Sequence, residues 1–454
     1  WGSCDIFVGA SCGTLFVLLC WGTPLPVGAH HGVPLLTILC YNHPMHTPVT
    51  IIGAGPAGMT AALFAARYGS KVRLIDSNEQ VGRKLLVTGS GHANLTNRNM
   101  GADRYTCADP SWMQTLLARF GHQDLIDFLK EIGILTYSTS DGWCYPLSES
   151  AQTVVDAFAS ALRQAGVELV LNTKIRAIRI KDGLFKLDIG TDQKIPTGPT
   201  LTAEKLIVAA GGKASPSLGS RGELFPSLKQ LGHTIVPLTP GLAPLTCDMK
   251  AYMTLQGMRM DARASLFEGR TLLAETTGNL IFANYGLNGP AVMDLSHHVS
   301  TRPGARLDLY LNPLFRYESN LRDLIAQMRQ TDTSLYVLLE SVLLPRLAKA
   351  LIAKAGYTLE TPVNEVNDDQ IEKLIRLASA IPFKVTGVRG FEYCQISAGG
   401  VPVTEVDPLN MRSLIVPNLF LVGETLDVVG PCGGYNLQFA FGSGAVAGMS
   451  VRDH

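Results

Sequence analysis

VTIIGAGPAGMTAALFAARYGSKVRLID, residues 49–76, is the stretch that decides the fold. Its apolar start predicts a buried parallel strand, and Gly53, Gly55 and Gly58 then form G-x-G-x-x-G at the entry of an Ala-rich helix. In this pattern the first glycine allows a tight turn, the second lets the backbone approach a pyrophosphate, and the third lets the helix pack closely on the strand. Asp76 ends a second predicted strand, at about the 20-residue offset that suits an acid binding an adenosine ribose. The stretch predicts a dinucleotide-binding unit without deciding between FAD and NAD(P).

The start of the predicted helix suits a diphosphate. Pro56 falls in the first helical turn, where its missing N–H costs nothing. A helix N-terminus carries about half a positive charge and free N–H groups, which favour an anion. A glycine-rich turn that binds no ligand is the alternative interpretation of the segment.

Composition bounds the class of protein. The 454 residues, 46% of them hydrophobic, have room for two or three domains of roughly 150 residues each. Lys plus Arg and Asp plus Glu both number 38, so the formal net charge is zero and leaves no electrostatic footprint for nucleic acid or an anionic membrane. We therefore expect a small-molecule substrate, no nucleic-acid partner and no membrane partner for the main body. The sequence gives no oligomeric state.

Cysteine spacing indicates the redox compartment. The nine cysteines are an odd number, and none forms C-x-x-C. This argues against a disulfide framework, a structural zinc site and a dithiol–disulfide reductase, and it favours a reduced, cytoplasmic compartment. We expect no metal site, because His297-His298 has no further ligands at metal spacing.

Residues 1–44 differ from the rest of the chain. They contain no Lys or Arg and hold four of the nine cysteines. A signal peptide would need a positively charged start, and Ile6 to Trp21 is short for a membrane span of about 20 residues. We interpret residues 1–44 as non-native upstream sequence or, alternatively, a membrane-associated leader, and we exclude them from the fold prediction.

Three further parts follow along the chain. Residues 45–212 read as the first part of an α/β domain, residues 213–384 as an inserted domain, and residues 385–454 as the second part of the α/β domain. Beyond residues 49–76, the first part is predicted to hold helices over 110–133 and 151–165 and strands over 168–171, 175–180, 184–189 and 205–210. The insert is predicted to hold strands over 263–267, 280–283 and 306–311 and helices over 321–328, 334–355 and 368–379.

A second informative segment stands near the C-terminus. A buried strand over residues 417–422 ends in Gly423 and Glu424, and an acid at that place can bind the hydroxyls of a ribityl chain. The glycine-rich loop of residues 430–434 then leads into a helix of small residues. A helix N-terminus beside the N1–C2=O edge of a flavin would stabilise negative charge on the reduced ring. A packed helix with a glycine-rich first turn is the alternative.

The two ends together favour FAD. An enzyme that binds only NAD does not need a second strand end with glycine and acid hundreds of residues later, whereas a split flavin site does. Residues 49–76 would bind the ADP part of FAD, and the C-terminal segment would bind the ribityl chain and the flavin ring. The chain has no second G-x-G-x-x-G, so a separate NAD(P) domain is not expected.

Five motifs carry a resemblance to a known family. They are GRKLLVTGSGHANLTN (residues 82–97), AAGGK (209–213), SAGGV (397–401), GETLD (423–427) and GGYNLQ (433–438). In the same order they resemble GRKLLxSGGGRCNxTN, ATGGK, TAGGV, GEVLD and GGYNLQ of the BaiN/YhiN-like NAD(P)/FAD-dependent oxidoreductases, also described as aminoacetone-oxidase-like flavoproteins.

The resemblance implies a fold and a set of cofactor contacts. The fold is a glutathione-reductase-like, Rossmann-type FAD domain interrupted by a β-barrel with a small helical part. His92-Ala93 replaces the family's Arg-Cys, and Ser90 replaces a glycine. A role of the Arg would pass to His92 only when the imidazole is protonated. The residues expected to bind FAD are Gly53, Gly55, Pro56, Ala57, Gly58, Asp76, Ser77, Arg83, Lys84, Ser90, Gly91, His92, Asn94, Ile175, Ala210, Gly211, Gly212, Gly423, Glu424, Gly434, Tyr435, Asn436 and Leu437.

The sequence thus predicts an FAD-dependent oxidoreductase, with NAD(P)H as the candidate reductant. No acid–base residue stands out: Tyr435, Asn436 and His92 are named only for their expected proximity to the flavin, and Tyr285 of the insert is expected to face the same cleft. Two alternatives stay open. One is a flavin-dependent RNA-modifying enzyme, and the other is a flavin-binding scaffold or sensor without turnover.

Overall fold

The computed structural model describes residues 10–11, 14–15, 46–190 and 200–452. The chain divides into two units, residues 1–43 and 44–454. In the first, β1 (Ala10–Ser11) and β2 (Thr14–Leu15) pair antiparallel. The interpretation of residues 1–44 otherwise lies outside the described residues. Within the described ranges, no helix has the length and apolar character needed to span a bilayer.

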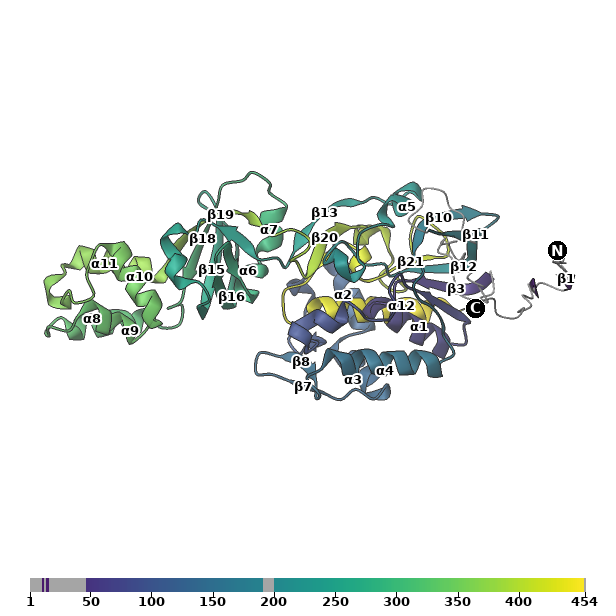
Figure 1. The fold of residues 1–454 in the computed structure, drawn as a ribbon, viewed down its shortest axis with the longest axis horizontal. Helices are drawn as coiled ribbons and strands as arrows, with labels where there is room; N and C mark the ends of the chain where they lie inside the picture. The colour runs from purple at the N-terminus through teal and green to yellow at the C-terminus, as the bar shows by residue number, and fades with distance from the viewer. Residues whose placement is uncertain (1–9, 12–13, 16–45, 191–199, 453–454) are drawn as a thin grey trace, which may run out of the picture. The chain divides into compact units, whose positions relative to one another are not determined.

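The second unit is built on a seven-stranded, mostly parallel sheet (Figure 1). Its order is β10-β11-β12-β3-β4-β9, with β21 pairing to β12 off that path. The pairs β21-β12, β12-β3, β3-β4 and β4-β9 are parallel, and β10-β11 and β11-β12 are antiparallel. The strands are β3 (His46–Ile52), β4 (Val72–Ile75), β9 (Glu168–Val170), β10 (Ile175–Lys181), β11 (Leu184–Ile189), β12 (Thr200–Val208) and β21 (Leu419–Leu421). This confirms the predicted Rossmann-type α/β fold.

Three parallel strands end together at one edge of this sheet. Val208 of β12 lies opposite Ile52 of β3 and also opposite Leu421 of β21. Past these ends, the Ala209 N–H donates to the Ile52 carbonyl (2.8 Å) and the Val422 N–H to the Val208 carbonyl (3.1 Å). The register therefore brings the first glycine-rich turn beside the strand end that precedes Glu424.

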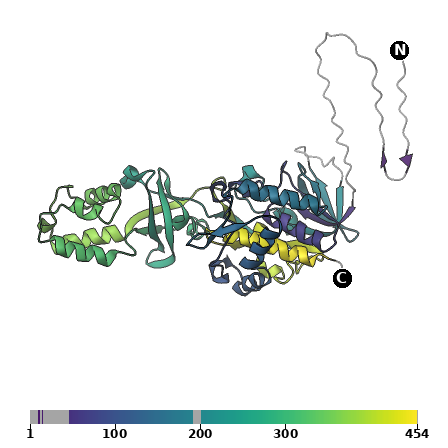
Figure 2. The ribbon, with the colours of Figure 1, turned by 90° about the horizontal axis from the view of Figure 1, so that it is seen from below.

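Two helices from opposite ends of the chain lie side by side on the sheet. They are α1 (Pro56–Arg67) and α12 (Tyr435–Ser450), as Figures 1 and 2 show. A Cβ on Gly444 would stand 2.2 Å from the Ala57 carbonyl oxygen, and one on Gly448 would stand 2.5 Å from that of Ala61. Glycine at these positions lets the two backbones approach, so the small residues of α12 are explained by packing.

The single helix predicted over residues 110–133 is wrong, because the chain forms two helices. They are α2 (Pro110–Arg119) and α3 (His122–Glu131). Phe120 leaves the helical region (φ −152°, ψ 89°), and Gly121 is extended (φ −91°, ψ −166°). The Gly121 N–H donates to the Asp124 carboxylate (2.8 Å), which caps the second helix. The predicted helix over 151–165 is confirmed as α4 (Ala151–Gln164).

Six strands of the middle segment close into a barrel in the order β14-β17-β16-β15-β18-β19. Along β15, alternate residues are buried, as expected for a barrel wall with one face inward. The barrel strand β19 crosses the predicted boundary at 384/385, continues to Val388 and pairs with β14 there. The strands are β14 (Leu245–Cys247), β15 (Arg259–Glu268), β16 (Thr271–Ala283), β17 (Gly286–Asn288), β18 (Leu307–Asn312) and β19 (Ile381–Val388).

Four helices between β18 and β19 share one hydrophobic core with the barrel. They are α8 (Glu318–Met328), α9 (Leu335–Glu340), α10 (Pro345–Ala355) and α11 (Asp368–Ser379). The one helix predicted over 334–355 is wrong, because Leu344 is extended (φ −57°, ψ 135°) before Pro345 begins α10. Proline disfavours a helical residue before it and lacks the N–H that a continuous helix would use.

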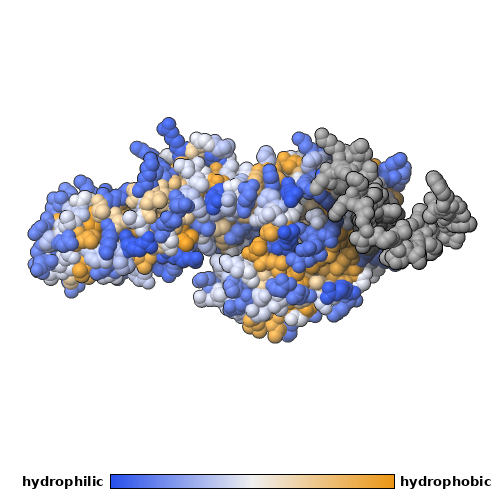
Figure 3. Space-filling model, viewed as in Figure 1, coloured by the Kyte–Doolittle hydropathy of each residue, from blue (hydrophilic) through white to orange (hydrophobic). Residues whose placement is uncertain are grey.

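Hydrophobic residues gather on one part of the surface. In Figure 3, orange atoms gather over the part of this face where α1, α2 and α12 lie in Figure 1, whereas the barrel and α8–α11 show mostly blue and white.

Short elements complete the unit. They are β5 (Thr96–Asn97), β6 (Thr106–Cys107), β7 (Thr136–Ser138), β8 (Trp143–Pro146), β13 (Val236–Gly241), β20 (Ile396–Gly400), β22 (Val428–Val429), α5 (Phe225–Gln230), α6 (Pro290–Met293) and α7 (Ser296–Ser300).

Candidate cofactor site

A cavity of about 880 Å³ opens where the three parallel strands end. Its wall includes the turn after β3, the segment after β12, the strand end at Gly423 and the glycine-rich loop before α12. The barrel contributes Arg259, Asn279 and Asn288. Both parts of the α/β domain and the insert therefore meet at one cavity.

The three glycines of the first motif meet different surroundings. Gly53 has φ +103°, and a Cβ there would stand 2.3 Å from the Ala209 carbonyl oxygen. A Cβ on Gly58 would stand 1.8 Å from the Gly53 carbonyl oxygen, so this position is packed. A Cβ on Gly55 meets no protein atom within 4 Å. Gly55 lines the cavity, so a bound molecule can approach its backbone closely. A pyrophosphate-binding turn requires this close approach.

Asp76 holds the first glycine-rich turn in place. Its Oδ2 accepts from the Ala54 N–H (2.6 Å), and its Oδ1 accepts from the Asn78 N–H (2.8 Å) and Nδ2 (2.9 Å). A carboxylate has about four acceptor sites, so it keeps capacity for a hydroxyl. The sequence predicted the ribose contact but not this bracing of the turn.

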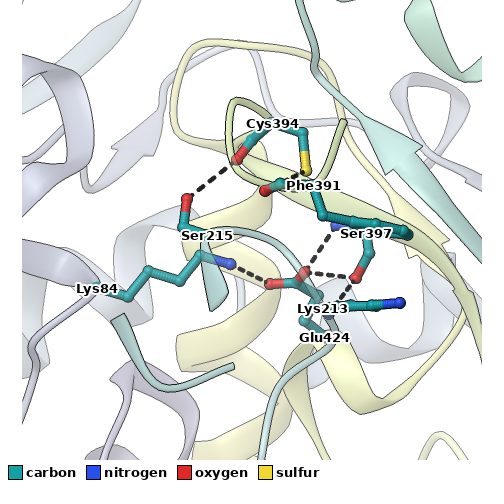
Figure 4. A network of polar contacts seen from close by, with 7 residues as sticks. All are labelled: Lys84, Lys213, Ser215, Phe391, Cys394, Ser397 and Glu424. Atoms are coloured by element: carbon teal, nitrogen blue, oxygen red, sulfur yellow. Dashed lines mark hydrogen bonds and ion pairs between the residues drawn. The ribbon is translucent and has the colours of Figure 1, made fainter. Parts of the chain in front are cut away.

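A polar network joins the two halves of the site across 340 residues of sequence. Lys84 Nζ lies 2.6 Å from Glu424 Oε2. Glu424 Oε1 accepts from the Ser397 N–H (2.7 Å) and hydroxyl (2.8 Å) (Figure 4). The Lys213 N–H in turn donates to Ser397 Oγ at 2.9 Å. Lys84 and Glu424 both line the cavity, so the ion pair forms part of its wall.

Arg83 and Lys84, both expected to bind FAD, have partners within the protein. Lys84 pairs with Glu424, and the Arg83 guanidinium donates to Asn78 Oδ1 at 2.9 Å. The Asn78 amide is neutral, so its contact with Arg83 does not neutralise the guanidinium charge. Lys84, in contrast, pairs with the Glu424 carboxylate. Ser397 was noticed only as part of a motif and was not assigned to the site.

The loop before α12 is fixed by its own side chains. Asn436 accepts from the Gly430 N–H (2.8 Å) and donates to the Gly430 carbonyl (2.8 Å). Gly433 and Gly434 take φ +106° and +95°, a region that favours glycine. Asn436 thus shapes the loop, and Gly433 and Gly434 of that loop line the cavity.

Asn94 carries an orphaned polar atom at the cavity wall. The residue is 7% exposed, and its Oδ1 is buried without a hydrogen-bond partner among the described residues. Asn94 lines the cavity. A buried acceptor without a partner costs free energy, so this atom suits a donor on a bound molecule.

The structure separates the predicted site residues into two groups. Five do not line the cavity: Gly58, Gly91, His92, Gly212 and Tyr435. His92 Nδ1 lies 2.8 Å from the Glu149 carbonyl, and the Tyr435 hydroxyl donates to the Asn99 carbonyl (3.1 Å). The predicted residues that line it are Gly53, Gly55, Pro56, Ala57, Asp76, Ser77, Arg83, Lys84, Ser90, Asn94, Ile175, Ala210, Gly211, Gly423, Glu424, Gly434, Asn436 and Leu437.

Two residues of the insert lie elsewhere than the sequence suggested. Tyr285 is not part of the cavity wall and packs under the Arg389 guanidinium, 4.5 Å from its ring centroid. The centroids of the His297 and His298 rings lie 4.0 Å apart, and the ring planes are tilted by 38°. Burial, with the neighbouring His298, lowers the pKa of His297 to about 4, so its ring is neutral. Among the residues that the structure describes, no three His, Cys, Asp or Glu side chains form a metal-binding group.

Comparison with known proteins gives a consistent set of relatives. The model of the HI0933-like protein Rossmann domain matches residues 47–450. A 3-dehydro-bile acid delta(4,6)-reductase of Clostridium scindens is 32% identical over 418 residues, which cover 89% of this chain and 99% of the relative. A ribosomal RNA dihydrouridine synthase of Escherichia coli is 30% identical, covering 87% and 95% respectively. One of the same name from Haemophilus influenzae is 26% identical, covering 88% and 97%.

Proposed function

Since the chain belongs to the HI0933-like family and is an FAD-dependent oxidoreductase, we propose that it reduces a carbon–carbon double bond conjugated to a carbonyl group in a small organic molecule. Membership confirms the resemblance drawn from residues 82–97 and the four shorter motifs. We further propose NAD(P)H as the source of electrons and FAD as the occupant of the cavity beside Gly55.

The observation that carries FAD binding is the open space at Gly55. The turn is packed at Gly53 and Gly58 but free toward the cavity at Gly55. The orphaned Asn94 Oδ1 supports the same occupant, because a flavin offers N–H and hydroxyl donors. When bound, FAD supplies hydride transfer.

The residues of this chain divide the remaining tasks. The Gly53 and Ala54 N–H groups already donate to Ile75 and Asp76, so the Gly55 turn and the start of α1 would bind the diphosphate. Glu424, held by Lys84 and Ser397, offers acceptors for the ribityl chain. The loop ending at Gly434 and the first turn of α12 would face the N1–C2=O edge of the ring.

The proposed substrate class rests on the names of the relatives. One acts as a delta(4,6)-reductase on a 3-dehydro-bile acid, and another is a dihydrouridine synthase. Hydride addition to an electron-poor double bond, followed by protonation, accounts for both activities. A double bond conjugated to a carbonyl is the feature that their chemistry has in common.

Ribosomal RNA is a second candidate substrate, because two relatives carry that activity in their names. The formal net charge of zero favours the small molecule, since phosphate neutralisation supplies most of the affinity of RNA-binding surfaces. A scaffold without turnover is the remaining alternative from the sequence.

One experiment separates the three. The purified flavoprotein is mixed anaerobically with NADH or NADPH, then with 2-cyclohexen-1-one or unmodified ribosomal RNA, while the flavin absorbance is followed. We expect bleaching by a nicotinamide and recovery with the enone. Recovery with RNA alone would favour the second candidate, and no bleaching or recovery under any condition would favour the scaffold.

A further inference from the structure

A carboxyl group of the insert touches the glycine-rich loop before α12. Asp294 follows α6, and its Oδ1 accepts from the Cys432 N–H at 2.7 Å. Cys432 lines the cavity, and so do Pro290 and Met293 on the Asp294 side. The side chain of Cys432 also interacts with this carboxyl group, so a thiol and a carboxyl group from segments 138 residues apart meet at the wall that would face the flavin ring.

The surroundings of this pair set its protonation. Burial raises the pKa of Asp294 to about 6, although the hydrogen bonds from Cys432 and the charge of Arg104 oppose this rise. Burial and the Asp294 carboxylate hold the pKa of the Cys432 thiol well above its usual range. His297, close to Asp294 in the chain, has a pKa lowered to about 4 and is therefore neutral at neutral pH, so it adds no positive charge beside the pair. The thiol therefore keeps its proton at neutral pH, whereas Asp294 is protonated below about pH 6 and mostly ionised above it.

We propose that the Cys432 thiol donates the proton that completes reduction of the substrate, and that Asp294 positions and reprotonates it; this rests on the reductase function proposed above. The hydride brings both electrons to the β-carbon. The S–H bond then breaks as a C–H bond forms at the α-carbon, which leaves a thiolate. The thiolate takes a proton from the Asp294 carboxyl group, which regains one from water, so the protein returns to its starting state.

Cys432 is distinguished from the other cysteine of the cavity wall by its partner. Cys394 also lines the cavity, but its thiol lies 3.5 Å from the Phe391 carbonyl, to which it donates. Burial raises the pKa of Cys394 to about 11. A neutral carbonyl cannot return a proton, whereas the Asp294 carboxyl group can. Of these two described thiols, Cys432 is therefore the one equipped for repeated proton transfer.

The first test measures single turnovers. Holoenzyme reduced with dithionite is mixed anaerobically with 2-cyclohexen-1-one, and flavin reoxidation is timed. Loss of a general acid costs about 100-fold or more, so C432A and C432S should reoxidise that much more slowly, with unchanged FAD content and unchanged reoxidation by oxygen. C107S is the control, because half-buried Cys107 does not line the cavity. A rate for C432A within twofold of wild type would overturn the proposal.

Asp294 is tested by its pH dependence. In wild type, steady-state enone reduction with excess NAD(P)H should fall as pH rises through about 6, because every cycle after the first needs the protonated Asp294 carboxyl group to return a proton to the thiolate. D294N keeps an acceptor for the Cys432 N–H but should lose this dependence. An unchanged profile in D294N would remove Asp294 from the proposal. If wild type reduces no enone at any pH, the proposed reductase function is wrong. If wild type is active and the Cys432 and Asp294 variants are equally active, only the role of these two residues is wrong.

A second readout does not depend on turnover. Iodoacetamide modifies thiolates, and peptide mapping by mass spectrometry follows each cysteine separately. Removing the Asp294 charge should lower the pKa of the thiol, so D294N should be alkylated severalfold faster at Cys432 at pH 8, with no change at Cys107. Equal rates at Cys432 in the two proteins would show that the carboxyl group does not control the thiol, and would contradict the inference.

Discussion

Gly55 and Gly58 belong to one motif, but we expect their substitution to have different effects: one should weaken FAD binding and the other should lower stability. Gly55 has extended backbone angles (φ −77°, ψ −176°) and open space where a Cβ would point. G55V should therefore keep the stability of the FAD-free protein and raise the dissociation constant for FAD at least tenfold, about 1.4 kcal/mol. Fluorescence titration of the FAD-free protein measures this.

G58A is the matched control. Its Cβ would stand 1.8 Å from the Gly53 carbonyl oxygen, and such overpacking costs about 1–3 kcal/mol. It should lower the free energy of unfolding of the FAD-free protein, measured with urea. If G55V destabilises the FAD-free protein as much as G58A does, the two roles are not separate.

Glu424 links the ion pair to the cofactor. E424A leaves Lys84 and the Ser397 N–H without their acceptor and should weaken FAD binding roughly tenfold or more, because hydrogen bonds to a charged group contribute about 1.5–3 kcal/mol. E424Q keeps an acceptor and should fall between E424A and wild type.

The control for Glu424 is E372A, which breaks a surface ion pair with Arg322 outside the cavity. Its FAD affinity should equal that of wild type. Unchanged affinity in E424A would remove Glu424 from the cofactor site, while the loss of affinity in both variants would indicate a nonspecific effect.

At the residue scale, the sequence predicted the part of the site that local pattern encodes. The roles of Gly53, Gly55 and Gly58 follow from their spacing alone, and their surroundings match them. The Lys84–Glu424 and Asp294–Cys432 contacts have no local pattern, because each joins residues far apart in the chain. They depend on the register of the strands and on the barrel, which one sequence does not specify.

Among the elements, α12 sets the geometry of the split site. The Gly423 N–H donates to Ser443 Oγ of α12 at 3.0 Å, and Gly444 packs on Ala57 of α1. G444A would place a Cβ 2.2 Å from the Ala57 carbonyl oxygen and push the two helices apart. We expect lower thermal stability and weaker FAD retention together.

S450A, in the last turn of the same helix, is the control. Ser450 donates to the Val446 carbonyl within α12 (2.8 Å), so its removal should change FAD retention little. Heat-released FAD per chain, after gel filtration, compares the variants. Equal retention in G444A and wild type would show that the α1–α12 contact does not position the site.

Element boundaries show where sequence patterns stop being informative. α11 occupies the residues over which a helix was predicted, and the structure adds a capping box of Asn367 and Gln370 at its start. The helices predicted over 110–133 and 334–355 each split in two, because an amphipathic pattern continues across a short break. Gly121 and Pro345 mark those breaks, and they are the local signals that the prediction passed over.

On the scale of the whole molecule, cofactor binding should appear as stability. A ligand present at 100 times its dissociation constant stabilises the native state by about 2.7 kcal/mol. FAD should therefore raise the Tm of the FAD-free protein more than FMN does at equal concentration, because FMN lacks the ADP that the turn at Gly55 is shaped to hold. Scanning calorimetry compares the two, and an equal shift would contradict a site with an ADP half.

The α/β fold could be predicted from the sequence, because a second strand that ends in glycine and an acid stands near the C-terminus. In the structure, that strand, β21, and β3 both pair in parallel with β12. The closed barrel was expected only in outline, since short alternating strands do not reveal their partners. The resemblance to a family supplied what periodicity lacked.

The measurement that tests the account most directly is an equilibrium titration of the FAD-free protein with FAD, followed by flavin fluorescence and by the absorbance of the flavin retained after gel filtration. We predict saturation at one FAD per chain, with weaker binding in both G55V and E424A, because one variant alters each half of the site. A protein that purifies colourless and takes up no FAD on reconstitution would contradict the account.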